Sequence, residues 1–518
     1  MVKIFIDEKP LEVEEGTTVL NAAEQACIDI PHLCYHSAFL PEGNCRMCLV
    51  EIEGLPKLEL ACSTQVREGM KISTKSEKVI EARKGVLEFL LAEHPLDCPI
   101  CDKAGECKLQ DYYEEYGLFE SQFEESKEKR EKRLKIGKNL ILDQERCILC
   151  TRCVRFLRDV TRTHELGVFN RGISSEIHIY EGLSVENNYS GNLAEICPVG
   201  AITDSDFRFK TRKWFLKKEE SICPLCSRGC NIYIEYHPGF PRFSVPKRVY
   251  RVKSRENQEV NGFWICDLGR YGYSYIDEGR LNQIVENVNH PLSELNLEKI
   301  LLFLAKKIKR LYHMKKTSHI ALILNTWLSN EELFLINKIF RIDLNVEKIF
   351  FVDPPEGEKD DFLLTSERTP NKRGAEEIGF DFKPLDLEAL GNGTQFLMAF
   401  GPHLSHHFSL TEIKPVFDKI ETKLLFTSFS NEMNALFDIV FPTALIAEKE
   451  GSLTNLEGKV QKFSQVLMLL GESQPEWKIM VDLAKKLEVN FNFYRQFSSP
   501  EIIFQEIGKE ITFFEKRK

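Results

Sequence analysis

Long hydrophobic runs, an excess of positive charge and nucleotide-binding motifs are all missing from this sequence. No uninterrupted apolar run reaches about 18 residues, so we expect no segment that spans a membrane by itself. The formal net charge of −10 at pH 7 argues against nucleic acid as the main partner. There is no Gly-x-Gly-x-x-Gly, no Walker motif and no acid–base or nucleophilic constellation, so we predict no nicotinamide, flavin or quinone site and no catalytic residue.

Cysteine is missing from the second half of the chain. All 16 cysteines lie between Cys27 and Cys266 of the 518 residues. The strand-like start, Met1–Asp7, leaves no room for a signal or transit peptide, so we expect a reducing compartment in which the cysteines do not form disulfides. Fifteen of them fall into four groups at ligand spacings, which predicts metal sites. Cys27 is left over, and its place at the apolar end of a predicted helix indicates packing.

One group includes a histidine. His94, Cys98, Cys101 and Cys107 follow the spacing H-x3-C-x2-C-x5-C, and residues 78–92 have the apolar periodicity of a helix that would deliver the histidine. Thiolates are the usual ligands of iron–sulfur clusters, and an imidazole in place of one thiolate changes the charge and potential of the cluster. A lone histidine is more often an ordinary surface or core residue, but its place before three cysteines favours ligation.

The first cysteine group follows a predicted hairpin, over 2–5 and 11–13, and a predicted helix over 19–26. The group is spaced C-x10-C-x2-C-x13-C and consists of Cys34, Cys45, Cys48 and Cys62. A hairpin, a helix and a cysteine loop resemble a β-grasp ferredoxin with a [2Fe–2S] cluster, although the plant-type spacing C-x4-C-x2-C has a shorter first interval. A zinc ribbon is the competing interpretation, but it usually pairs two C-x2-C knuckles and this segment has one.

The third group combines a C-x2-C-x2-C run with a remote Cys-Pro. Its members are Cys147, Cys150, Cys153 and Cys197. This pattern is typical of [4Fe–4S] ferredoxin modules, in which the fourth cysteine of one run ligates the other of two clusters. The 43 residues between Cys153 and Cys197 contain no cysteine, so we predict that Cys197 closes the site of the remaining triplet.

The fourth group has the spacing C-x2-C-x3-C-x35-C. Its members are Cys223, Cys226, Cys230 and Cys266. Four thiolates suit both zinc and [4Fe–4S], and three other predicted iron–sulfur sites in the same chain favour iron.

Basic residues flank two of the groups. Lys103 and Lys108 are expected to offset the negative charge of a cluster at the second group. Arg152, Arg155 and Arg158 flank the third group and are predicted to tune its potential. The mixed-charge run at 124–135 indicates a solvated linker or helix face, with a docking surface as an alternative.

The residues after about 276 alternate between strand and helix patterns, which indicates an α/β layer architecture with a mostly parallel sheet. We predict strands at 318–325, 349–352, 396–400 and 423–426, and helices at 300–312 and 329–340. Gly401-Pro402-His403 follows one strand, where doubly wound folds bind ligands, but the signal is weak. His403, His406 and His407 lack accompanying carboxylates or cysteines and indicate a surface cluster, with metal binding as a minor alternative.

Taken together, the four groups resemble the large iron–sulfur subunit of bacterial NADH:quinone oxidoreductase, respiratory complex I, which is its G subunit. The resemblance covers residues 1–275 motif by motif, and the segment Glu88–Cys107 is especially specific. The remainder is similar to a molybdopterin oxidoreductase domain that has lost its cofactor, and Ala447–Gln461 resembles that family's pattern. The tail after Cys266 is shorter than in most members, and the long gap before Cys266 makes the fourth site the least secure.

The resemblance implies one [2Fe–2S] cluster at the first group and one [4Fe–4S] cluster at each of the other three, the fourth being an additional cluster found in only some members. It also implies the fold class, a multidomain α+β and α/β chain, and, as a separate expectation, no molybdopterin cofactor. The expected domains are a β-grasp [2Fe–2S] domain at 1–77, a His/Cys3 [4Fe–4S] domain at 78–119, a ferredoxin-type [4Fe–4S] domain at 120–210, a molybdenum/tungsten-oxidoreductase-type [4Fe–4S] domain at 211–275, and a shortened molybdopterin-oxidoreductase-like α/β domain at 276–518.

The implied function is a one-electron relay within a larger NADH-oxidising complex that couples electron transfer to proton translocation. Electrons would arrive from a flavin- and NADH-binding subunit with its small [2Fe–2S] partner and leave for quinone-side iron–sulfur subunits. Membrane contact, on the cytoplasmic side of the plasma membrane, would come only through partners. An electron-input subunit of a soluble NAD-linked hydrogenase or formate dehydrogenase complex is the alternative. A true molybdenum or tungsten enzyme or an [FeFe]-hydrogenase would need further ligands, and no cysteine follows Cys266.

Overall fold

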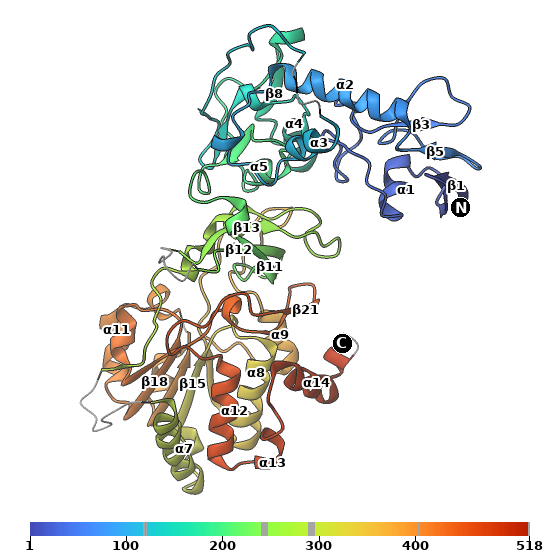
Figure 1. Cartoon of the computed structure of the whole chain (residues 1–518). Coiled ribbons are helices and arrows are strands. Elements are labelled where there is room, and N and C mark those ends of the chain that lie inside the picture. Colours follow the sequence, from blue (N-terminus) through green and yellow to red (C-terminus); the bar gives the residue numbers. More distant parts are fainter. Residues whose placement is uncertain (118–119, 121, 240–246, 288–295, 402, 516–518) are drawn as a thin grey trace. The chain divides into compact units, whose positions relative to one another are not determined.

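The computed structural model describes residues 1–117, 120, 122–239, 247–287, 296–401 and 403–515. The chain divides into two compact units, Met1–Leu216 and Lys217–Lys518 (Figure 1). Among the described residues, none of the helices has the length and apolar character needed to span a membrane. Pro402, in the segment predicted to follow a strand as a weak ligand site, lies outside the described residues.

The first unit begins with a five-stranded sheet in the order β2-β1-β5-β3-β4. Asp7 and Glu8 both take left-handed backbone conformations (φ 48° and 68°), the geometry of a tight two-residue hairpin turn between β1 and β2. The helix α1 begins after Thr18, whose side chain accepts a hydrogen bond from the Asn21 amide and so caps the helix. The elements are β1 Val2–Ile6, β2 Lys9–Val13, α1 Val19–Gln25, β3 Leu49–Ile52, β4 Glu59–Leu60 and β5 Lys71–Ser73.

Two helices follow, as the periodicity of 78–92 predicts for the first. They are α2 Glu77–Glu93 and α3 Lys108–Tyr116. The mixed-charge run after them forms no helix in its described residues, and part of it binds the end of α2. Lys127 donates to the carbonyls of Leu91 and Ala92 at 2.6 and 2.8 Å, where a cation stabilises the exposed carbonyls of a helix end.

Short elements complete the first unit. The strands β6, β7 and β10 form one sheet and β8 and β9 a second, with α4 and α5 beside them. The elements are β6 Leu134–Lys135, β7 Leu140–Leu142, α4 Arg152–Arg155, β8 Leu166–Phe169, β9 Glu176–Ile179, α5 Asn192–Ile196 and β10 Ile202–Asp204.

The second unit opens with an antiparallel three-stranded sheet in the order β11-β12-β13. A short helix, α6, packs against β13. Their bounds are β11 Lys217–Ile222, β12 Asn231–Tyr236, β13 Val249–Ser254 and α6 Asp267–Tyr271.

A six-stranded sheet forms the centre of the second unit, in the order β14-β19-β18-β17-β15-β16. All of its pairings are parallel except that of the edge strand β14 with β19, so the prediction of a mostly parallel sheet is confirmed. The strands are β14 Val285–Glu286, β15 Ile320–Leu324, β16 Lys348–Phe351, β17 Phe396–Phe400, β18 Thr422–Thr427 and β19 Ile439–Pro442.

Both faces of this sheet are buried. Alternate residues of β15 enter different cores: Leu322 packs into one, together with residues of α7, α8 and α12, and Ile323 into the other, together with residues of α11. The helices therefore cover both faces, as Figure 1 shows, and continuous apolar strands follow from this double burial. The helices are α7 Leu297–His313, α8 Asn330–Ile336, α9 Lys372–Ile378, α10 Leu387–Gly391, α11 Leu410–Phe417, α12 Glu476–Leu487, α13 Phe491–Tyr494, α14 Pro500–Glu510 and α15 Thr512–Glu515.

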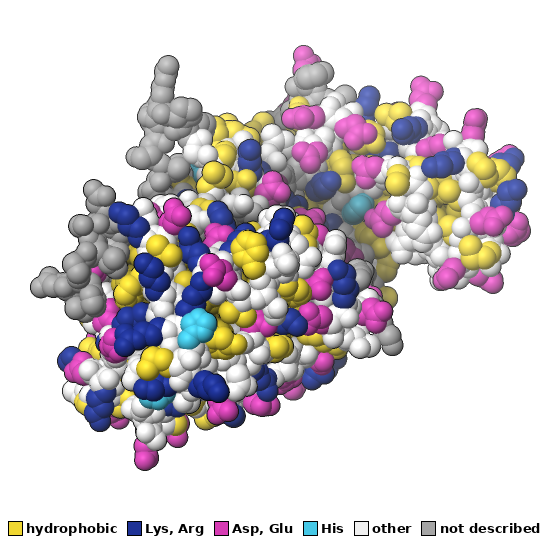
Figure 2. Space-filling model, turned by 90° about the horizontal axis from the view of Figure 1, so that it is seen from below, with side chains coloured by type: hydrophobic (Ala, Val, Ile, Leu, Met, Phe, Trp, Pro, Cys, Tyr) yellow, Lys and Arg dark blue, Asp and Glu magenta, His cyan; other side chains and the backbone are white. Residues whose placement is uncertain are grey.

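A hairpin of β20 Gly451–Thr454 and β21 Val460–Phe463 packs against α8 and β11. It lies within the segment that the sequence relates to molybdopterin oxidoreductases. On the face shown in Figure 2, basic and acidic side chains are intermixed with scattered apolar ones.

Candidate iron–sulfur sites

The first cysteine group lies in the loops of the β-grasp sheet. Cys34 and Cys45 belong to the long connection between α1 and β3, Cys48 directly precedes β3, and Cys62 follows β4. Each is at most 7% exposed. The Ala61 amide donates to the Cys48 carbonyl at 2.9 Å, so backbone pairing holds the last two thiols near each other.

The four thiols of this group form two hydrogen-bonded pairs. The Cys34 thiol lowers the pKa of Cys45 to about 6, and its own pKa is raised. The Cys48 thiol likewise lowers the pKa of Cys62, and the pKa of Cys48 is raised. Each iron of a [2Fe–2S] cluster takes two protein ligands, so two thiol pairs fit the donor set of such a cluster.

The second group is arranged around the ends of α2 and α3. His94 is the residue at which α2 ends, and Cys107 is the residue from which α3 begins. Cys101 is buried, whereas Cys98 is exposed. Burial raises the pKa of Cys101 and raises that of Cys107 to about 11, so both thiols hold their protons until a cluster displaces them.

His94 has the properties of a ligand. Burial lowers its pKa to about 4, which keeps the imidazole neutral at pH 7. Its Nδ1 atom is buried and has no hydrogen-bond partner among the residues that the structure describes. A neutral imidazole with an unused lone pair is the form that binds metal.

The third group is formed by two loops with tight backbone turns. Leu149 and Thr151 both adopt left-handed conformations (φ 51° and 58°), which wrap the chain between the first three cysteines. Cys153 then lies in α4, and Cys197 is the residue at which α5 ends.

All four members of the third group line one cavity, together with apolar side chains such as Leu142 and Val199. Burial and the neighbouring thiols raise the pKa of Cys147 and of Cys150 to about 12. The prediction that Cys197 returns to the triplet therefore agrees with this placement, because a remote cysteine and three local ones face the same space.

The ligand loops of the first and third groups are in direct contact. The Arg155 guanidinium donates to the carbonyl of Cys34 and, at 3.2 Å, to that of Cys150. The Asn44 side-chain Nδ2 donates to the Leu149 carbonyl at 3.0 Å. The Arg155–Cys34 and Asn44–Leu149 hydrogen bonds join residues that lie far apart in the sequence.

The second group also contacts the third. Arg146, directly before Cys147, pairs with Asp97, directly before Cys98, with an Nε–Oδ1 distance of 3.0 Å. The Lys108 amide donates to the Pro198 carbonyl at 3.2 Å. The third group therefore contacts both of the others, and the loop of the first group also meets α3, where the His32 amide donates to the Tyr112 hydroxyl at 3.0 Å.

Close packing strengthens the contact between the second and third groups. Gly200 approaches the second group so closely that a Cβ atom there would overlap the Cys101 sulfur. Lys103, expected to offset cluster charge, is buried, and its ammonium donates to the Ala194 carbonyl at 3.0 Å. This lysine therefore ties the two loops together as well as carrying charge.

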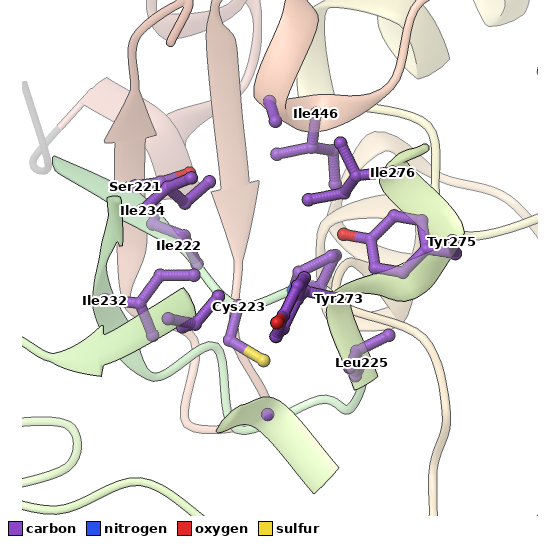
Figure 3. A pocket seen from close by; sticks show the side chains of 14 residues that line it. Ser221, Ile222, Cys223, Leu225, Ile232, Ile234, Tyr273, Tyr275, Ile276 and Ile446 are labelled. Carbon is purple, nitrogen blue, oxygen red and sulfur yellow. The ribbon is translucent and has the colours of Figure 1, made fainter. Parts of the chain in front are cut away.

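The fourth group lies in the second unit. Cys223 follows β11, Cys230 precedes β12, and Cys266 is the residue from which α6 begins. All four cysteines are at most 5% exposed, and burial raises the pKa of Cys266 to about 12. Figure 3 shows Cys223 among the side chains that line a cavity, and a Cβ atom on Gly269 would lie 3.2 Å from its sulfur.

The β20–β21 hairpin holds the loop of the fourth group. The Gln461 side chain donates to the Gly229 carbonyl at 2.9 Å and accepts from Asn231 at 2.5 Å. The Leu456 amide donates to the Ser227 carbonyl at 2.9 Å. The long interval before Cys266 contains β12 and β13, which accounts for its length.

One prediction about another residue is wrong. Cys27 does not pack: α1 ends at Gln25, and Cys27 takes a left-handed conformation (φ 57°) in the following turn and is exposed. His406 and His407 are exposed, as predicted for a surface cluster, whereas His403 is half-buried, stacks on His406 with ring centroids 5.5 Å apart, and has its pKa lowered to about 4 by burial.

The donor sets fit iron–sulfur clusters in three respects: the thiols are mostly buried, they lie in facing loops, and His94 offers an unpaired nitrogen. Within the described ranges, no three His, Cys, Asp or Glu side chains are arranged as ligands of one metal ion. Sequence reasoning missed the arginine and glycine contacts between the groups, whose only signal was the basic residues beside the cysteines.

Family models match five segments of the chain. They describe a 2Fe-2S iron-sulfur cluster binding domain (1–77), an NADH-ubiquinone oxidoreductase-G iron-sulfur binding region (83–122), an NADH-quinone oxidoreductase subunit 3 ferredoxin-like domain (137–203), a molybdopterin oxidoreductase Fe4S4 domain (216–278) and a molybdopterin oxidoreductase (409–486). These matches and the mixed sheets and helices confirm the predicted fold class.

The chain is similar to several curated proteins. The G subunit of the NADH-quinone oxidoreductase of Rickettsia felis is 39% identical over 341 residues, 66% of this chain and 49% of that protein. The NADH-ubiquinone oxidoreductase 75 kDa subunit of Reclinomonas americana is 36% identical over 372 residues, 71% of this chain and 52% of that protein. The chain thus spans about half the length of the curated relatives it matches.

A chain from the crystal structure of an NAD+-reducing [NiFe]-hydrogenase in the H2-reduced state is 33% identical. The match covers 40% of this chain and 90% of that chain, with a TM-score of 0.37.

Proposed function

We propose that this chain, which is a relative of the large iron–sulfur subunit of NADH-quinone oxidoreductase, relays electrons one at a time between bound iron–sulfur clusters. The observation that carries the proposal is the continuity of the three ligand loops in the first unit. Arg155 joins the first group to the third, and the Arg146–Asp97 pair joins the third to the second. Electron transfer needs such neighbouring redox centres.

The proposed ligands follow the four groups. A [2Fe–2S] cluster takes Cys34, Cys45, Cys48 and Cys62, and three [4Fe–4S] clusters take His94, Cys98, Cys101 and Cys107; Cys147, Cys150, Cys153 and Cys197; and Cys223, Cys226, Cys230 and Cys266. The clusters supply the redox chemistry, and the chain sets their potentials through ligand type, hydrogen bonds and burial. The domain boundaries proposed from the sequence, at 77, 119, 210 and 275, go with these four sites.

The order of contacts suggests a route. We place the first group at the input end, near a flavin- and NADH-binding subunit with its small [2Fe–2S] partner, and the second group at the output end, near a quinone-side iron–sulfur subunit. The third group lies between them. The fourth, in the other unit, is outside this route. In a complete complex of this kind, the transfer would be coupled to proton translocation, with the chain held at the cytoplasmic face of the membrane by its partners.

An apolar groove supports the choice of output end. A cavity of about 640 Å³ lies beside the second group and is lined by His94, Cys98 and Cys107 together with side chains of α2 and α3. Phe89 and Leu96 on its rim are 86% and 78% exposed. Exposed apolar surface of this kind marks contact sites for other proteins, and here it would bring a partner's cluster next to His94.

The test compares two cysteine variants in the purified NADH-oxidising complex. Cys150→Ala removes the middle site, so we expect quinone reduction by NADH to be lost while reduction of an artificial one-electron acceptor at the flavin is retained. Cys226→Ala in the fourth group serves as the matched control and should leave both activities. Quinone reduction that survives Cys150→Ala, with the third cluster absent by EPR, would contradict the proposed route.

The alternative is an electron-input subunit of a soluble NAD-linked hydrogenase or formate dehydrogenase complex. Proteins that co-purify with the chain distinguish the two. Membrane-embedded quinone-reducing subunits support the proposal, whereas a nickel–iron or molybdenum subunit supports the alternative.

A further inference from the structure

Two arginines of α4 reach from the third cysteine group into the first. Arg155 is 1% exposed, and besides the Cys34 and Cys150 carbonyls its guanidinium donates to the Leu40 carbonyl at 3.1 Å. Arg152 donates to the carbonyl of Tyr35. Both side chains therefore end beside the backbone that carries the first proposed ligand of the [2Fe–2S] site.

Arg152 also holds the far side of the third group, because it donates to the Ile196 carbonyl at 3.2 Å, directly before Cys197. Each arginine thus contacts the ligand loops of two groups. A guanidinium suits this role because its planar fork of donors serves several carbonyls at once.

The charge of these two arginines is only weakly compensated. Glu42 lies 3.7 Å from the Arg155 Nε, is itself 36% exposed and also accepts from the Thr151 hydroxyl. Among the described carboxylates, none forms an ion pair with Arg152. The junction between the first and third groups therefore carries excess positive charge in a buried setting, where electrostatic effects are stronger than in water.

At the other junction the arginine has close carboxylate partners. Arg146, between the third and second groups, pairs with Asp97 through three hydrogen bonds of 3.0, 3.2 and 2.5 Å and has Asp143 at 3.5 Å. Its charge is therefore cancelled. Arg158, in the same run as Arg155, is half exposed and pairs with Asp159 at 2.7 Å.

We propose that the positive charge of Arg155, together with that of Arg152, raises the midpoint potentials of both the cluster at the first group and the cluster at the third group. The inference rests on the proposed function. Reduction adds an electron to a cluster, so a nearby cation with little compensation stabilises the reduced form, and net charge is one of the terms that set cluster potentials. One shared cation pair thus links the potentials of two neighbouring clusters.

The experiment is an EPR-monitored redox titration of the anaerobically purified full chain. We expect Arg155→Gln to lower the midpoints of the [2Fe–2S] cluster and of one [4Fe–4S] cluster. A tenfold change in the ratio of reduced to oxidised cluster, which equals about 59 mV for one electron, is the expected size. The other two clusters serve as internal controls. Arg158→Gln is the matched control and should leave all midpoints unchanged.

Arg155→Lys separates charge from hydrogen bonding. Lysine keeps the cation but not the fork, so we expect midpoints close to those of the unchanged chain. Equal downward shifts in Arg155→Lys and Arg155→Gln would overturn the inference, because charge would then not be the cause. If Arg155→Gln does not keep its clusters, Arg152→Gln provides the same comparison, and unshifted midpoints in that loaded variant would also overturn it.

The outcomes separate this inference from the proposed function. If the unsubstituted chain binds no clusters, both the proposed function and this inference fail. Loaded clusters with unshifted midpoints in the glutamine variants overturn only the role of the arginines.

Discussion

Single residues decide the chemistry of the second group, and His94 is the most informative of them. A neutral imidazole in place of a thiolate makes the cluster less negative, which raises its potential. We therefore expect His94→Cys to lower the midpoint of one [4Fe–4S] cluster, while the remaining clusters of the same chain stay unchanged. An identical midpoint on EPR-monitored titration would show that His94 is not a ligand.

Gly200 gives a second prediction at this scale. A methyl group at this position would overlap the Cys101 sulfur, so Gly200→Ala should displace that ligand. We expect the purified variant to lose the EPR signal of the His94-ligated cluster and to keep that of the [2Fe–2S] cluster. Gly85→Ala in α2 is the control for a small side chain in open space, since no atom lies within 4 Å of a Cβ added there. Full cluster content in Gly200→Ala would contradict the packing described here.

At the residue scale, the spacing of cysteines predicts which residues could share a site. It does not predict which sites touch. The contacts of Arg155 and Gly200 join segments far apart in the sequence, and an arginine beside a cysteine looks the same whether it faces water or a second loop. Cys27 shows the opposite error: the helix ends at Gln25, before the cysteine, and an apolar side chain turns outward.

The elements of the second unit bury a charged network that no local pattern indicates. Lys449 pairs with Glu332 of α8 at 2.8 Å and with Glu476 of α12 at 2.7 Å. Glu331 accepts from the Ser452 hydroxyl at 2.7 Å and from the Ser452 amide at 2.9 Å. Charged residues normally predict a solvent-exposed helix face. Here the packing of three elements buries these charged residues instead.

The network makes stability depend on pH. Burial raises the pKa of Glu331 to about 7, whereas an unfolded glutamate has a pKa of about 4.3. Between these values the native state binds more protons than the unfolded state, so the free energy of unfolding falls as the pH rises and levels off above about 7. The size of this contribution is about 4 kcal/mol.

We expect Glu331→Gln to flatten this decline, because the variant has no proton to lose at position 331. The free energy of unfolding is measured by urea denaturation at pH 5 to 8, with tryptophan fluorescence as the signal. Trp264, Trp327 and Trp477 all lie in the second unit. Glu476, whose pKa burial also raises to about 7, should leave part of the slope in place. Exposed Glu347→Gln is the control. A decline as steep as in the unchanged chain would contradict the assignment.

At the scale of elements, periodicity predicts well where one strong signal dominates. The α2 helix and the strands β15 to β18 follow from apolar runs and capping residues. The mixed-charge run at 124–135 is mostly exposed, as a solvated linker would be, and some of its basic side chains also bind backbone carbonyls and carboxylates of other segments. Composition alone does not distinguish such binding from solvation.

The whole molecule divides its predicted redox sites unequally. Three groups share the first unit in continuous contact, and the fourth lies in the second unit, which also holds the doubly wound sheet. The third group contacts both of the others, although it comes last of the three in the sequence. Cysteine spacing thus predicts the number and type of sites, whereas the route proposed between them requires the fold.

Iron and acid-labile sulfide per chain, measured on anaerobically purified protein, test the central claim most directly. One [2Fe–2S] and three [4Fe–4S] clusters predict about 14 iron atoms with matching sulfide, and no stoichiometric zinc, molybdenum or tungsten. About 10 iron atoms would mean that only the three sites of the first unit hold iron–sulfur clusters. Stoichiometric zinc in place of iron, or molybdenum or tungsten bound to the second unit, would contradict a chain that only relays electrons.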